Sequence, residues 1–145
     1  MTSSQRMLCG LFGLIAVAAL LATWSQNLAY FAEGGGPGAF ARFIDETRVN
    51  PASRSITVDI GFFYYAAAIF MVVEARRLGV RWVWAYVIGG LLIAISVTFP
   101  LFLIAREMAI PREAGEGGSP RTFDVVGLAL LGFLVAGLSL YVLRA

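Results

Sequence analysis

The sequence contains no histidine, no lysine and a single cysteine, Cys9, and each of these gaps removes a class of chemistry. Without histidine there is no imidazole to bind a metal or haem, or to transfer protons near neutral pH. One cysteine allows neither an intrachain disulfide nor a cysteine-based metal site. The absence of lysine rules out a Schiff base. We therefore expect neither a metal nor a cofactor.

Charge is also scarce, because charged residues make up 14% of the chain and hydrophobic residues 59%. The mean hydropathy of +0.81 is far above that of a soluble domain. All 11 basic residues are arginine, which is typical of GC-rich bacterial genomes. They form no run interleaved with aromatics, so we expect no nucleic-acid partner. The polar stretches at 32–55 and 106–121 are too short to bury separate cores, which predicts one transmembrane domain over residues 1–145.

Four long apolar stretches cover most of the chain, at about residues 7–31, 56–74, 82–105 and 123–143. A helix of about 20 apolar residues crosses a bilayer core. The sequence therefore predicts an all-α integral membrane four-helix bundle. The first stretch resembles a signal peptide, but it is long for one and lacks a good cleavage site, so we expect it to be retained as a span.

Residues 39–49, between the first two spans, have an amphipathic pattern. Phe40, Phe43 and Ile44 share one helical face, and charged residues occupy the others. This pattern is typical of a short helix that lies in the membrane interface. The Asn50-Pro51 pair is expected to end it, and Ser55 is a candidate N-cap for the second span.

The third span carries an aromatic anchor and a helix breaker. Trp82 and Trp84 are expected at the interface. Pro100 cannot donate a backbone hydrogen bond, so a kink is expected near it. Small residues in the last two spans favour close helix packing. These residues are Gly89, Gly90, Gly132 and Ala136.

The arginines give only a weak orientation signal. With the N-terminus inside, five arginines lie on the cytoplasmic side and six on the other. Three of the five crowd the short turn at 76–81, and this density favours that orientation under the positive-inside rule. We expect a multi-pass protein of the bacterial inner membrane with both termini cytoplasmic.

This topology would gather polar residues from three helix ends at the outer face. They are the candidate ligand-binding residues Gln26, Asn27, Thr57, Asp59, Thr98 and Arg106. Asp59 lies about one turn inside the second span, where an ionisable group often serves a function. It is the only catalytic candidate, as a proton acceptor or the partner of a cation. The preferred interpretation is structural: a first-turn carboxylate that the helix dipole favours and that pairs with Arg106.

The opposite end of the second span carries a basic cluster. We expect Glu74 to pair there with Arg77 or Arg81. Residues that contact lipid headgroups or a protein partner are expected beside this pair. They are Arg76, Arg77, Arg81, Trp82 and Trp84.

Several short blocks occur in an order that resembles a known family. They are Thr23-Trp24-Ser25-Gln26-Asn27-Leu28-Ala29-Tyr30-Phe31, Asn50-Pro51-Ala52-Ser53-Arg54-Ser55 with Asp59, Glu74-Ala75-Arg76-Arg77-Leu78-Gly79, and Pro100-Leu101-Phe102-Leu103 before Arg106. In this order the chain resembles small bacterial multi-span membrane proteins known as domain of unknown function 2834. The resemblance covers about residues 7–107 and implies no activity.

Three functions fit these observations. The preferred one is non-catalytic: an accessory or assembly subunit of a membrane complex, or a binder of a lipid-like ligand, with membrane lipids and a membrane-protein partner or a second copy as partners. One alternative is a small isomerase or cyclase for a terpenoid or lipid, with Asp59 as its acid. The other is a dimeric proton-coupled exporter of small cations, for which Asp59 would be a shallow site.

Overall fold

The computed structural model describes residues 1–34, 38–110 and 122–143, and within these residues every regular element is a helix. The elements are α1 (Ser3–Gly34), α2 (Ala39–Glu46), α3 (Pro51–Leu78), α4 (Val83–Gly89), the wider helical turn η1 (Gly90–Ala94), α5 (Ile95–Ala109) and α6 (Thr122–Leu143). Four helical segments are long and apolar enough to cross a membrane: Ser3–Ala32, Pro51–Leu78, Val83–Ala109 and Thr122–Leu143. The predicted all-α membrane bundle is confirmed.

The chain divides into two compact units, residues 1–110 and 111–145. The second unit contains α6, a single helix of 22 residues in which no side chain is buried. Within α6 the carboxylate of Asp124 lies in the first turn, where the helix dipole favours a negative charge. The first unit contains α1 to α5 and η1.

The predicted short helix between the first two spans is confirmed as α2. It begins after Gly38, whose φ of 93° is a left-handed conformation that glycine adopts without strain. Side chains fix α2 to the end of α1. The rings of Tyr30 and Phe43 meet edge to face with centroids 5.4 Å apart, and Arg42 Nε donates a hydrogen bond of 3.2 Å to Tyr30 Oη. Phe40 and Ile44 remain exposed, as an interfacial helix requires.

α3 begins at Pro51, earlier than the start near residue 56 predicted from the sequence. Asn50 is its N-cap, and its side-chain oxygen accepts a hydrogen bond of 2.9 Å from the Ser53 amide. Pro51 follows as the first helical residue, a position that needs no backbone donor. Ser55, the expected cap, therefore lies inside the helix. Gly79, in a left-handed conformation, ends α3 after 28 residues.

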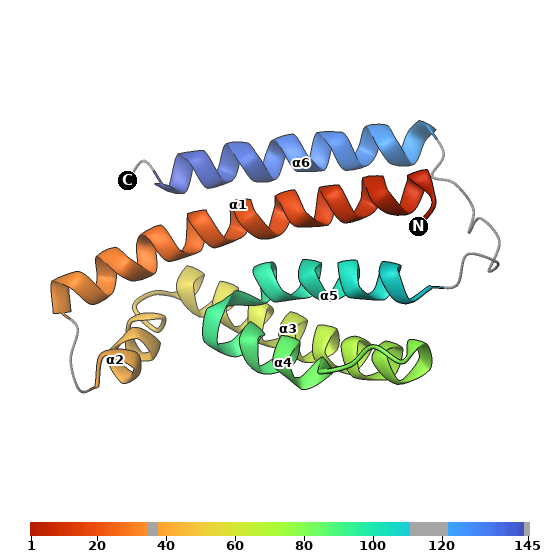
Figure 1. Ribbon diagram of the computed structural model, residues 1–145. Coiled ribbons are helices and arrows are strands. Elements are labelled where there is room, and N and C mark those ends of the chain that lie inside the picture. Colours follow the sequence, from red (N-terminus) through yellow and green to blue (C-terminus); the bar gives the residue numbers. More distant parts are fainter. Residues whose placement is uncertain (35–37, 111–121, 144–145) are drawn as a thin grey trace. The chain divides into compact units, whose positions relative to one another are not determined.

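The third apolar stretch folds back on itself instead of forming one straight helix. Ala94, the last residue of η1 and the N-cap of α5, is extended, with φ of 177° and ψ of 141°. The rings of Tyr86 and Phe102 lie 5.8 Å apart, whereas a straight helix would separate these positions by about 24 Å. Figure 1 shows α4 and α5 as the two arms of this hairpin. Pro100, near which a kink is expected, lies buried within α5, six residues after Ala94.

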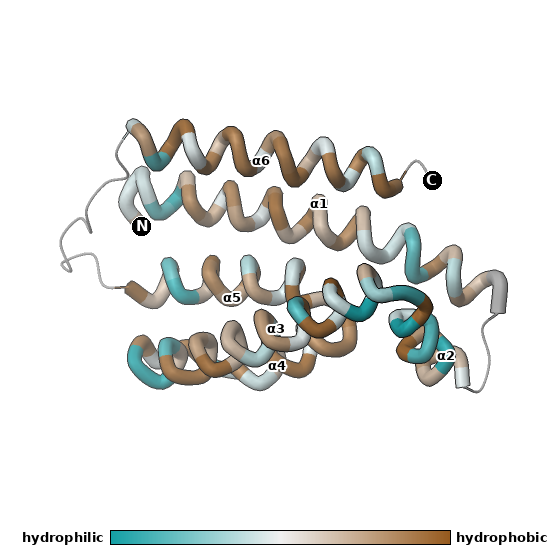
Figure 2. Tube along the Cα trace, turned by 180° about the vertical axis from the view of Figure 1, so that it is seen from behind, coloured by the Kyte–Doolittle hydropathy of each residue, from teal (hydrophilic) through white to brown (hydrophobic). Residues whose placement is uncertain are grey.

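The core of the first unit forms where α3, α4 and α5 meet. Met71, Val87 and Phe102 are buried there, and neither Met71 nor Phe102 has any exposed surface. α5 lies between α1 on one side and the α3–α4 pair on the other (Figure 1). Figure 2 shows hydrophilic residues gathered at the two ends of this unit, around α2 and around the C-terminal ends of α3 and α5.

Candidate functional site

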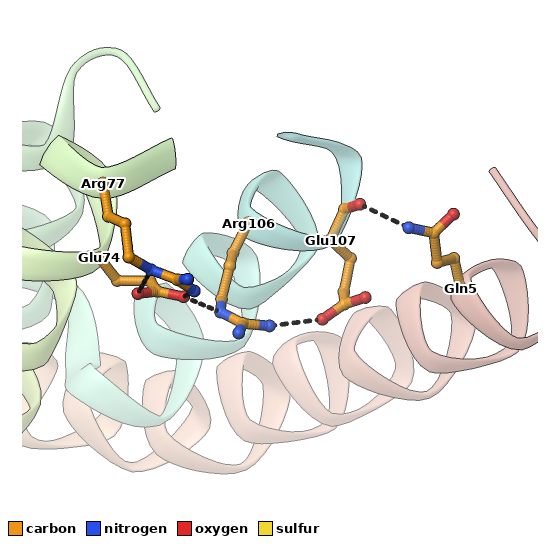
Figure 3. Close-up of polar contacts among 5 residues, drawn as sticks. All are labelled: Gln5, Glu74, Arg77, Arg106 and Glu107. Atoms are coloured by element: carbon orange, nitrogen blue, oxygen red, sulfur yellow. Dashed lines mark hydrogen bonds and ion pairs between the residues drawn. The ribbon is translucent and has the colours of Figure 1, made fainter. Parts of the chain in front are cut away.

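A chain of polar contacts joins three helix ends at the C-terminus of α3 (Figure 3). Its centre is Glu74, which is only 7% exposed. Arg77 donates hydrogen bonds to both carboxylate oxygens of Glu74, from Nε to Oε2 at 2.7 Å and from Nη2 to Oε1 at 2.5 Å. Arg106, from α5, donates from Nε to Oε1 at 2.8 Å. One buried carboxylate thus holds two guanidinium groups, so its charge is compensated.

The same contacts continue to α1. Arg106 Nη1 lies 2.7 Å from Glu107 Oε1, and Gln5 Nε2 donates a hydrogen bond of 3.2 Å to the Glu107 carbonyl oxygen. We call Gln5, Glu74, Arg77, Arg106 and Glu107 the polar network (Figure 3). It ties the start of α1 to the ends of α3 and α5.

The network confirms one predicted pair and overturns another. Glu74 pairs with Arg77, as expected. The expected pair between Asp59 and Arg106 is wrong, because Arg106 binds Glu74 and Glu107. Fifteen residues separate Asp59 from Glu74 on α3, a rise of about 22 Å. The reversal at Ala94 returns Arg106 to the Glu74 end, whereas a straight third helix would have carried it away.

Beside the network, the residues of the turn between α3 and α4 line an open hollow of about 490 Å³. Its backbone is unusual at two points. Gly79 has φ of 72°, and Trp82 has φ of 61°, the one positive value for a residue other than glycine in the described chain. A left-handed tryptophan costs about 1–3 kcal/mol. The basic-aromatic hollow, as we call it, is lined by Ala75, Arg76, Gly79, Val80, Arg81, Trp82, Val83, Trp84 and Ala85.

Two arginines at the hollow have no charged partner in the part of the chain that the structure describes. Arg77 is occupied by Glu74, but Arg76 and Arg81 are exposed and have no ion-pair or side-chain hydrogen-bond partner among the described residues. Trp82 and Trp84 are 78% and 56% exposed. The hollow therefore presents two unpaired guanidinium groups and two indoles, an arrangement suited to an anion that has an apolar part.

Of the ligand-binding residues expected around Asp59, Thr98 and Arg106 make their contacts elsewhere. Thr98 is buried inside the α4–α5 hairpin, where its hydroxyl lies 3.4 Å from the Ala94 carbonyl oxygen, and Arg106 belongs to the polar network. Thr57 Oγ1 donates to the Ser53 carbonyl within α3. Gln26 is exposed and Asn27 is half-buried, both near the end of α1.

Asp59 itself is exposed in a wide, shallow groove. The other residues that line this groove are Pro51, Arg54, Ser55, Val58 and Phe62. Among the described residues, no ion pair reaches Asp59. No group of three His, Cys, Asp or Glu side chains in the described part of the chain could hold a metal ion. Arg54 and Ser55 share this groove with Asp59, but the groove does not give Asp59 the enclosure that acid catalysis on a lipid would require.

Of the small residues expected at helix contacts, Gly89 and Gly90 are packed closely, whereas Gly132 and Ala136 are not. Gly90 is buried, and a Cβ there would lie 3.0 Å from both Thr98 Oγ1 and Tyr64 Cε2. A Cβ on Gly89 would lie 3.1 Å from Thr98 Cγ2. In α6, a Cβ on Gly132 would meet nothing within 4 Å, and Ala136 is exposed. A packing partner for Gly132 and Ala136 stays a prediction.

The model of the family described as protein of unknown function DUF2834 matches residues 11–108. The chain belongs to this family. The match confirms the resemblance seen in the sequence blocks and covers nearly all of the first unit, including the basic-aromatic hollow and most of the polar network. α6 lies outside it. No curated protein and no solved structure matches the chain.

Proposed function

We propose that this DUF2834 protein is a non-catalytic protein of the bacterial inner membrane that binds an anionic lipid headgroup in its basic-aromatic hollow. One observation carries the proposal: the unpaired guanidinium groups of Arg76 and Arg81 stand beside the exposed indoles of Trp82 and Trp84. The hollow lies where the apolar length of α3 ends, the depth at which headgroups meet a span.

The chemistry of the lining fits a lipid phosphate. A guanidinium group matches two phosphate oxygens at once, and each arginine near a membrane surface contributes about 1 kcal/mol toward anionic lipids. Tryptophan prefers the membrane interface, where its ring contacts acyl chains and its N–H faces polar groups.

The alternatives receive less support. An isomerase or cyclase needs an enclosed pocket beside Asp59, but the groove there is shallow and Asp59 is exposed. An exporter needs a carboxylate deep in the membrane, and the buried one, Glu74, is held by two arginines. An accessory role is compatible with lipid binding, because the same residues could contact a partner protein.

The first prediction is a preference for anionic lipid that the hollow tryptophans report. The chain has three tryptophans, so the Trp24→Phe variant keeps indoles only at Trp82 and Trp84. Since the Trp24 nitrogen is buried without an acceptor, this change removes no hydrogen bond between described residues. In nanodiscs, brominated phosphatidylglycerol should quench the remaining fluorescence at a lower mole fraction than brominated phosphatidylcholine does.

Matched double variants test which arginines cause this preference. Arg76→Ala with Arg81→Ala should weaken the preference by about 30-fold, from about 1 kcal/mol for each charge. Arg48→Ala with Arg54→Ala removes the same charge near the other end of α3 and should leave the preference intact. Equal quenching by the two lipids, or an equal loss in both double variants, would contradict the proposal.

A second prediction separates the indole of Trp82 from its backbone. Trp82→Gly should keep or raise stability by up to about 1 kcal/mol, because glycine adopts the left-handed conformation without strain. Trp84→Gly is the matched control: it lies inside α4 and should cost about 1 kcal/mol. Thermal unfolding in detergent measures the stability of both variants. A larger loss for Trp82→Gly than for the control would show that its indole packs for stability.

A further inference from the structure

We infer that Val83–Ala109 is a re-entrant hairpin, which enters and leaves the membrane on the face that holds the N-terminus. The third apolar stretch would then not cross the bilayer. This inference concerns how the chain passes through the membrane and does not depend on lipid binding. Only its consequence for the hollow rests on the proposed function.

The lengths of the helices are the first step. α4 and η1 together have 12 residues, or about 18 Å, and α5 has 15 residues, or about 22 Å. Neither arm spans a hydrocarbon core of about 30 Å. α1 and α3, with 32 and 28 residues, reach about 48 and 42 Å and are long enough to cross.

The polar network fixes where the second arm ends. Arg106, near the end of α5, binds Glu74 near the end of α3, and the Glu107 carbonyl accepts a hydrogen bond from Gln5 at the start of α1. The start of α1 and the ends of α3 and α5 therefore lie close together (Figure 3). In a bilayer this would put all three on one membrane face. The end of α1, α2 and the start of α3 would lie on the other.

Irregular backbone at membrane depth needs cover from the protein itself. One side of the hairpin turn has this cover, whereas the apolar side chains of Leu91, Leu92 and Ile93 on the turn are exposed. Gly90 is buried and Thr98 is 5% exposed, so the two arms touch closely at the turn. Polar groups there have internal partners: the Thr98 hydroxyl lies 3.4 Å from the Ala94 carbonyl oxygen, and Tyr64 Oη donates to the Val87 carbonyl at 2.8 Å.

The hairpin also changes the distribution of charge between the two faces. Among the described residues, the N-terminal face has five arginines and the other face has three. They are Arg6, Arg76, Arg77, Arg81 and Arg106 against Arg42, Arg48 and Arg54. The positive-inside rule then places the N-terminal face in the cytoplasm, so the hollow would take its lipid from the cytoplasmic leaflet. With α1, α3 and α6 as its spans, the chain would make three crossings instead of four.

Cysteine labelling tests the hairpin directly, because Cys9→Ala gives a chain without cysteine. Single cysteines are then placed at exposed positions: Ser4→Cys, Ala52→Cys and Met108→Cys. Bacterial cells that express the full chain are treated with a membrane-impermeant maleimide before and after permeabilisation. We expect Ala52→Cys to react in intact cells, and Ser4→Cys and Met108→Cys to react only after permeabilisation.

A straight third span would make Met108→Cys react together with Ala52→Cys, and this result would overturn the hairpin. If the maleimide labels both Met108→Cys and Ser4→Cys in intact cells, the hairpin stands and the orientation is overturned. A reporter fused after residue 145 gives an independent reading should Met108→Cys resist labelling. A periplasmic reporter supports three crossings, and a cytoplasmic reporter contradicts them. Neither readout depends on whether the hollow binds lipid.

Discussion

Replacing Glu74 with alanine is expected to lower the free energy of unfolding by about 3–5 kcal/mol, because the change removes the central charge of a buried ion-pair cluster. The Glu74 side chain is 9% exposed and holds both Arg77 and Arg106. Without it, Arg106 keeps Glu107 as its partner but loses its link to α3. Unfolding of the purified protein in mixed detergent micelles, followed by circular dichroism, measures the loss.

The matched control for Glu74 is Arg77→Ala. The Arg77 side chain is 62% exposed, and pairs this open to solvent contribute about 1 kcal/mol or less. A double-mutant cycle of Glu74→Ala with Arg106→Met should show a coupling of at least about 1 kcal/mol. Losses of similar size for Glu74→Ala and Arg77→Ala, or additive effects in the cycle, would show that the network does not hold α3 to α5.

Features that depend on neighbouring residues were predictable from the sequence. The four apolar segments follow from their length, and α2 from the apolar face of Phe40, Phe43 and Ile44. The Glu74–Arg77 pair joins residues three apart on one helix, which are neighbours on its surface. The start of α3 was also readable, because Asn50-Pro51 is a helix-initiating pair as well as a helix-ending one.

Features that depend on the reversal at Ala94 were not predictable in the same way. The segment from Val83 to Ala109 has the length and hydropathy of a span, and its local sequence contains no strong turn signal. Gly89-Gly90 is the one cue, and it also suits straight helix packing. Contacts across the hairpin stabilise the reversal. The position of the end of α5 depends on this reversal, so the partner of Arg106 could not be derived from the sequence. For the same reason the predicted ion pair between Asp59 and Arg106 is wrong.

Phe102→Ala is expected to cost about 3–5 kcal/mol, the second large effect, because it opens a cavity where three elements meet. Phe102 has no exposed surface, and its ring packs edge to face against Phe70 of α3 at 6.3 Å and Tyr86 of α4 at 5.8 Å. Phe62→Ala, which removes the same ring from a position that is 73% exposed, should cost less than about 1 kcal/mol. The same unfolding measurement compares the two variants.

A double-mutant cycle between Phe102 and Tyr86 turns this loss into a test of the hairpin. The contact of the two rings should appear as a coupling of about 0.5–1.5 kcal/mol when Phe102→Ala and Tyr86→Ala are combined. In a straight helix the two positions would lie about 24 Å apart and their effects would add. A coupling near zero, together with a large loss for Phe102→Ala alone, would mean that Phe102 is buried by other neighbours and that α4 does not fold back onto α5.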